Sequence, residues 1–174
     1  MRTLFRVIQF LFFGTLCFGV PINSAMADAE ADIAFLVNAK QPPTGVVFEV
    51  VEGDAQVWES VAGQIGDFIA RLKQASPTMK FAVVSHGREE FALLSENQTQ
   101  QPRLHAAIKN LVAQNVPVQV CGTHAGWQDK TRKDFPAYVD VVDAGPAQIL
   151  QYQRQGYALV RVRPAGKPSP TTHQ

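Results

Sequence analysis

Apolar runs rich in β-branched residues alternate with amphipathic segments along most of the chain, and this alternation constrains the fold more than any other feature. Strands are predicted at 45–53, 79–87, 116–122, 139–145 and 156–163. In the segments between them, apolar residues recur every three or four positions, which predicts helices at 57–75, 104–115 and 146–155. Strands separated by helices are typical of βαβ units. The sequence therefore predicts an α/β fold with a mostly parallel five-stranded sheet.

The first 27 residues have the features of a secretory signal peptide. Arg2 and Arg6 precede an apolar segment at 7–20 that is too short for a comfortable membrane span. The small residues Ala25 and Ala27 then form a cleavage pattern. We therefore expect cleavage after Ala27 and an exported, periplasmic protein.

Two further segments flank the predicted domain. Residues 28–44 form an N-terminal lead-in, in which "DIAFLVNAK" could form a short helix or an edge strand. Residues 164–174 are rich in proline and poor in apolar side chains, so we expect a disordered tail. The residues from 45 to 163 remain as one domain.

The net charge excludes two classes of partner. The formal charge of the whole chain is +1, and removal of two arginines with the predicted signal peptide gives −1, because residues 1–27 contain no acidic residue. Without a basic excess, we expect neither nucleic acid nor a membrane surface as a partner after cleavage.

One cysteine, Cys121, remains once Cys17 is removed with the signal peptide, so no internal disulfide can form. Cys121 and Gly122 end the third predicted strand, and His86 follows the second. The carboxyl ends of parallel strands meet at one edge of a sheet, where ligands bind. We therefore expect these residues to share one rim.

The loop after Cys121 suits a reactive thiol. Gly122 permits a sharp turn, the amides of Thr123 and His124 could point at the sulfur, and the His124 side chain could supply a charge or a proton. A partly reachable thiol, stabilised as the thiolate, is the expectation that follows. A buried, inert cysteine that ends a strand remains an alternative. A metal site made of Cys121, His124 and His86 is a weaker one, because no CxxC pair and no fourth ligand is visible.

Two aromatic residues near these segments are interpreted as structural. His105 lies on a predicted helix, and we expect it at the surface or the rim of the core. Trp127 is expected to cover the loop as a packed aromatic.

The segments "KFAVVSHG", "NVPVQVCG" and "VDVVDAGPAQILQYQRQGYALVRV", in this order and spacing, resemble the DsrE/DsrF-like family of small sulfur-relay proteins. The resemblance covers about residues 45–163. It implies a flavodoxin-like three-layer sandwich that assembles as a homotrimer or a hexamer. It also implies that Cys121 carries sulfur as a persulfide between donor and acceptor, with His86 as a pocket residue.

These observations predict an exported DsrE-like protein that binds or transfers sulfane sulfur on Cys121 in periplasmic sulfur-compound metabolism. It would act as a sulfurtransferase or a sulfur carrier without a cofactor. Thiolate support is expected from Gly122, Thr123, His124 and His86. Sulfur transfer suits a single cysteine, whereas a disulfide oxidoreductase normally keeps a second thiol. The alternative is a non-enzymatic oligomeric module that binds a small anion or a metal at this rim.

Overall fold

The structure, a computed structural model, describes residues 24–54 and 56–164 of the 174-residue chain. Its strands are β1 (Gly45–Val50), β2 (Lys80–Ser85), β3 (Val118–Cys121), β4 (Asp140–Val142) and β5 (Tyr157–Arg161). Its α-helices are α1 (Ser24–Val37), α2 (Val57–Ala75), α3 (Pro102–Ala113), α4 (Gly122–Gly126) and α5 (Gly145–Arg154). Three 3₁₀ helices complete the chain, η1 (Arg88–Leu93), η2 (Ser95–Asn97) and η3 (Arg132–Asp134).

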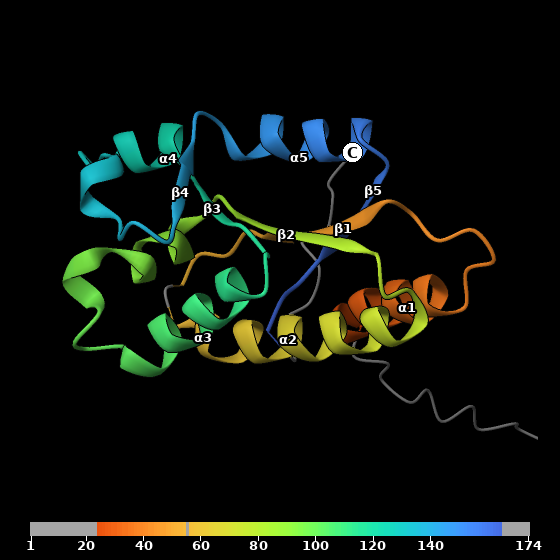
Figure 1. Cartoon of the computed structure of the whole chain (residues 1–174). Helices are drawn as coiled ribbons and strands as arrows, with labels where there is room; N and C mark the ends of the chain where they lie inside the picture. Colours follow the sequence, from red (N-terminus) through yellow and green to blue (C-terminus); the bar gives the residue numbers. More distant parts are fainter. Residues whose placement is uncertain (1–23, 55, 165–174) are drawn as a thin grey trace, which may run out of the picture.

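All five strands are parallel and form one sheet in the order β4-β3-β2-β1-β5. Helices α1, α2 and α3 cover one face, and α4 and α5 lie on the other (Figure 1). This is the flavodoxin-like α/β sandwich expected for the chain, and the predicted parallel sheet is confirmed. From β1 the chain adds β2, β3 and β4 on one side, and then returns to place β5 on the other side of β1. The topological switch point therefore lies between β1 and β5, and β1 is two strands away from β3.

The periodicity of the sequence explains where the core lies. Helix α2 has the predicted bounds, and its apolar side buries Trp58, Ile65 and Phe68 against the sheet. Strands β1 and β3 are buried along their whole length, as expected of parallel strands covered on both faces. The second core, beneath α5, is much smaller and contains four buried residues, Val47, Ala82, Val84 and Ile149. The α5 side of the sheet is therefore thinly covered.

The N-terminal lead-in is mostly helix. Helix α1 begins at Ser24, runs past the predicted cleavage position after Ala27, and packs Ala29, Ile33 and Leu36 into the main core. Most of the predicted signal peptide, residues 1–23, lies outside the described residues, as does the predicted tail from residue 165 onward. Among the helices that the structure describes, none has the length and apolar character needed to cross a membrane.

Candidate functional site

The predicted residues do meet at the carboxyl edge of the sheet. Cys121 is the last residue of β3 and pairs in register with Val142 of β4. Ser85 of β2 pairs with Val120, so His86 and Cys121 each follow one member of this pair. Two neighbouring strands thus deliver the thiol and the imidazole to one rim.

Cys121 is held through its backbone and its sulfur. Its N–H donates to Glu90 Oε2 at 3.0 Å, and its Sγ accepts from the His124 N–H at 3.4 Å. The residue is only 5 % exposed, so the expectation of a reachable thiol is wrong for this conformation. All four residues of β3 are buried, and Glu90 and the His124 backbone contact its last residue, so the strand ends before it reaches solvent.

Gly122 and Thr123 join this loop to the β4–α5 turn. A Cβ at Gly122 would lie 2.9 Å from the Val142 carbonyl oxygen, so the close approach of the two backbones requires glycine. Thr123 donates to the Asp143 carbonyl from both its N–H, at 3.0 Å, and its Oγ1, at 2.7 Å. Both residues therefore set the position of the loop and are not bonded to the sulfur.

The buried carboxylate of Glu90 links the cysteine to the histidine. Glu90 is fully buried on η1, and its second oxygen, Oε1, lies 2.9 Å from His124 Nδ1. Burial raises the pKa of Glu90 above its ordinary value, and the hydrogen bonds from Cys121 and His124 offset only part of this shift. The charge of neighbouring Glu89 raises it further. One side chain thus fixes both the end of β3 and the ring of His124.

Glu89, also fully buried, organises the end of β2. Its Oε1 accepts from Ser85 Oγ at 2.7 Å and from the Gly87 N–H at 2.9 Å. Its Oε2 accepts from the Glu52 N–H at 2.6 Å. A carboxylate with three donors is well satisfied in spite of its burial. It ties the segments that follow β1 and β2 to η1.

The His124 ring lies between two aromatic side chains. Its centroid is 5.3 Å from that of Phe91 and 5.6 Å from that of Trp127. Trp127 is 73 % exposed and meets the His124 ring in a T-shaped contact, so it does not cover the loop as a packed aromatic. His105 also differs from its expected place: it is buried on α3, with its Nδ1 2.6 Å from the Tyr138 hydroxyl.

A second charged group lies at the same rim, at the switch point of the sheet. Glu49 of β1 bonds His86 Nε2 through Oε1 at 2.9 Å, and its Oε2 accepts from Arg161 Nε of β5. Burial favours the protonated form of Glu49, but the hydrogen bonds and charges of His86 and Arg161 outweigh it and lower the pKa of Glu49 below its ordinary value. Sequence reasoning missed this group, although a glutamate inside the apolar run "GVVFEV" was a visible signal.

Glu49 and Glu90 should give the folding stability opposite dependences on pH. The folded state lowers the pKa of Glu49, so its contribution is present above the ordinary value of 4.5 and is lost as the pH falls through the folded-state pKa. The folded state raises the pKa of Glu90, so its contribution is present below 4.5 and is lost as the pH rises through the folded-state pKa. As the pH rises from about 3 to about 7, the free energy of unfolding of wild type should increase relative to that of Glu49→Gln. Over the same range it should decrease relative to that of Glu90→Gln. Urea unfolding across this range measures both differences, and equal signs would contradict the assignment.

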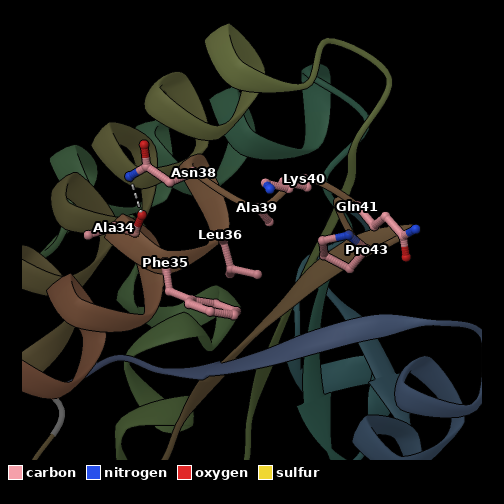
Figure 2. A pocket seen from close by; sticks show the side chains of 8 residues that line it. All are labelled: Ala34, Phe35, Leu36, Asn38, Ala39, Lys40, Gln41 and Pro43. Atoms are coloured by element: carbon pink, nitrogen blue, oxygen red, sulfur yellow. Dashed lines mark hydrogen bonds between the residues drawn. The ribbon is translucent and has the colours of Figure 1, made fainter.

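Two hollows of the surface bear on access. One of about 350 Å³ lies beside the β4–α5 turn and is lined by Val141, Val142, Asp143 and Ala144 with Gln148 and Gln151 of α5. A larger one of about 690 Å³ lies at the opposite, amino edge of the sheet, where the end of α1 leads into β1 (Figure 2). Phe35 and Leu36 line it beside Lys40 and Pro43, and no carboxylate belongs to its lining. The hollow at β4–α5 is the nearer of these two to Cys121, because Val142 in its lining pairs with Cys121.

Within the described residues, no group of three or more histidine, cysteine or acidic side chains is arranged to hold a metal ion. The nitrogens His86 Nε2 and His124 Nδ1 each face a carboxylate instead. The three residues considered as metal ligands therefore separate into a thiol and two histidine–glutamate pairs.

Comparison with solved structures places the fold among known proteins. The chain superposes on a protein of unknown function, MTH1491 from Methanobacterium thermoautotrophicum, with a TM-score of 0.56 and 21 % identity over 67 % of this chain and 97 % of that one. It superposes on the ychN protein from E. coli with a TM-score of 0.52 and 17 % identity over 68 % of this chain and 99 % of that one. Both have the DsrE/DsrF-like fold. This chain shares that fold. No family model and no curated protein matches the sequence.

Proposed function

We propose that this chain is an exported DsrE-like sulfur carrier or sulfurtransferase, which holds sulfane sulfur as a persulfide on Cys121. The observation that carries the proposal is the position of Sγ at the carboxyl end of β3, where it accepts the His124 N–H in a loop fixed by Glu90. An amide donor stabilises a sulfur anion, whether thiolate or persulfide. The resemblance of the sequence to the DsrE/DsrF-like family over residues 45–163 implies the same chemistry.

Burial of Cys121 fits a carrier outside the cytoplasm. An exported thiol faces oxidants, and a side chain only 5 % exposed is protected from them. A sulfur donor must then reach Sγ through a local opening of the loop. Helix α4 has only five residues and is followed by exposed Trp127, and we propose that it is the element that opens.

The test is the mass of the protein after incubation with thiosulfate or polysulfide. Wild type should gain sulfur that a reductant removes, and peptide mapping should place it on Cys121. Cys121→Ser should gain none, while Ser85→Ala, which removes a hydroxyl near the same rim, should still be loaded. Wild type that gains no sulfur from any donor would instead favour the non-enzymatic module that binds a small anion or a metal.

The proposal of export is supported by the basic N-terminus, the apolar segment at 7–20 and the small residues before Asp28. Cleavage after Ala27 would leave Asp28 and Glu30 in the first turn of the remaining helix, where acidic side chains stabilise a helix. A periplasmic protein whose N-terminal residue is Asp28 is the expected result of cell fractionation and N-terminal sequencing. An intact Met1 in the cytoplasm would contradict it.

We also propose that the protein forms a homotrimer or a hexamer, as the family resemblance implies. The thin cover of the α5 side supports this, because the apolar core there contains only four buried residues and Leu150 of α5 is exposed. Light scattering of the purified protein should give a trimeric or hexameric mass. A monomer at micromolar concentration would count against it.

A further inference from the structure

His86, Glu49 and Arg161 form a chain of polar contacts that fixes one nitrogen of an imidazole as a proton acceptor. Arg161 and His86 hold the two oxygens of Glu49, and the lowered pKa of Glu49 keeps it ionised near neutral pH. A carboxylate accepts hydrogen bonds, so His86 Nε2 carries the proton that faces Oε1. Nδ1 of His86 then holds the lone pair. A carboxylate fixes the tautomer of a catalytic histidine in the same way in serine hydrolases.

His86 and Cys121 project from the same side of the sheet. Ala82 and Val84 of β2 face α5, and side chains alternate along a strand, so His86 faces α5 as well. The contact of His86 with Gly145, the first residue of α5, confirms this direction. Gln119 of β3 accepts from Tyr152 of α5, and two residues later Cys121 points the same way.

The separation between the two side chains follows from the sheet. They each come directly after the register pair Ser85–Val120, and His86 still bonds β1 through its N–H and the Val50 carbonyl. Neighbouring strands lie about 4.8 Å apart. The ladder between β2 and β3 ends at this pair, and the Cys121 N–H bonds Glu90, so the approach of Nδ1 to Sγ depends on the opening of the loop.

The second histidine at the rim has a different place. His124 Nδ1 pairs with Glu90, and its ring packs between Phe91 and Trp127. It meets the sulfur through its backbone N–H and not through its ring. This contact suits stabilisation of a sulfur anion and requires no proton transfer.

We propose that His86, oriented by Glu49 and Arg161, takes the proton from the Cys121 thiol during loading and returns it after hand-off. The proposal rests on the sulfur chemistry proposed above for Cys121. It assigns the proton transfer to His86 and the orientation of its ring to Glu49, and leaves to His124 and Glu90 the positioning of the loop.

Atoms and charges balance in both steps. In loading from thiosulfate, Nδ1 accepts the thiol proton, and the thiolate attacks the outer sulfur. The Sγ–S bond forms as the S–S bond of thiosulfate breaks, and sulfite leaves with the bonding electron pair. In hand-off, an acceptor thiolate attacks the terminal sulfur, Sγ leaves as a thiolate, and the His86 imidazolium returns its proton to Sγ. Neither step needs an external oxidant or reductant.

The charged groups around His86 come from three segments, namely β1 with the residues after it, η1, and β5 with the residues after it. Glu49 and Arg161 contact it directly or through one carboxylate. The other charged groups that face this corner of the rim are Glu52 after β1, Glu89 on η1 and Arg163 after β5, which lies 3.8 Å from Glu52. Helix α5 contributes Gly145 and no acidic side chain in its first turn.

The test is the rate of persulfide formation from thiosulfate as a function of pH, measured on the purified full chain. His86→Gln should be loaded about 100-fold more slowly than wild type near pH 7, which is the usual contribution of a general base. It should approach the wild-type rate at about pH 10, where a free thiol ionises without a base. Glu49→Gln should show the same pattern with a smaller loss, because Gln no longer fixes the tautomer. Glu96→Gln, which changes an exposed glutamate, should follow wild type at every pH.

A rescue experiment separates proton transfer from a structural role. Added imidazole should restore the loading rate of His86→Gly near pH 7. Gly145→Ala, which keeps His86, should be loaded more slowly than wild type, because the added Cβ would lie 2.6 Å from the His86 Cβ and displace the imidazole. Loading of His86→Gln that matches wild type at every pH, or that stays slow at about pH 10 and is not rescued, would overturn the assignment. If wild type itself is never loaded with sulfur, the result contradicts both the proposed function and the role of His86. If wild type is loaded and the His86 variants behave as it does, only the role of His86 is contradicted.

Discussion

Replacement of Glu90 by alanine is expected to lower the free energy of unfolding by about 3 kcal/mol, because it removes a fully buried side chain and leaves a buried donor without its acceptor. Glu90 is fully buried, and both of its oxygens are bonded. Alanine would leave the buried Cys121 N–H without an acceptor and would open a cavity beside His124. For a domain of this size, the melting temperature should fall by roughly 6–12 °C.

Two further variants make this expectation specific. Glu90→Gln keeps the volume and one carbonyl oxygen for the Cys121 N–H, so its loss should be about 1 kcal/mol. Glu96→Ala removes a glutamate whose side chain is 65 % exposed and pairs with Lys130, and such surface pairs contribute less than about 1 kcal/mol. Urea unfolding measures all three. Equal losses for Glu90→Ala and Glu96→Ala would show that Glu90 does not hold the loop.

The periodicity of the sequence predicted the five strands and helices α2, α3 and α5, whereas the segment of α1 was left open between a helix and a strand. Helix α2 begins and ends at the predicted residues, since its apolar positions follow one side of a helix for five turns. The position of Cys121 at the carboxyl edge was also predictable, because it ends an apolar run and is followed by glycine. These features depend on local pattern alone.

The two histidine–glutamate pairs were not predictable in the same way. Charged residues are rarely buried, so "REEFALL" after β2 gave no reason to place Glu89 and Glu90 inside the protein. Glu49 and Arg161 are 112 residues apart and meet only because β5 lies beside β1. Strand order is a property of the whole fold, and periodicity does not contain it.

Trp127 and His105 were misplaced for a related reason. An aromatic residue after a loop usually packs, but α4 ends at Gly126 and leaves Trp127 at the surface. The polar side chain of His105 suggested the surface, yet the Tyr138 hydroxyl, 33 residues away, provides a partner inside the protein. In both cases, distant segments decide the environment.

Replacement of Cys121 by serine is expected to abolish sulfur loading completely. Serine keeps the size and the acceptor for the His124 N–H, so the loop should remain folded. Its hydroxyl does not ionise near neutral pH and forms no persulfide. A loss of loading with unchanged unfolding would therefore report the chemistry and not the fold.

The most direct test of a persulfide on Cys121 uses thiosulfate labelled with a sulfur isotope at either the outer or the inner position. Label from the outer sulfur should appear on Cys121 of wild type and leave with a thiol acceptor, whereas label from the inner sulfur should appear in free sulfite. Cys121→Ser should take up neither label. Inner-sulfur label on the protein, or outer-sulfur label that remains on Cys121→Ser, would contradict sulfur transfer through this cysteine.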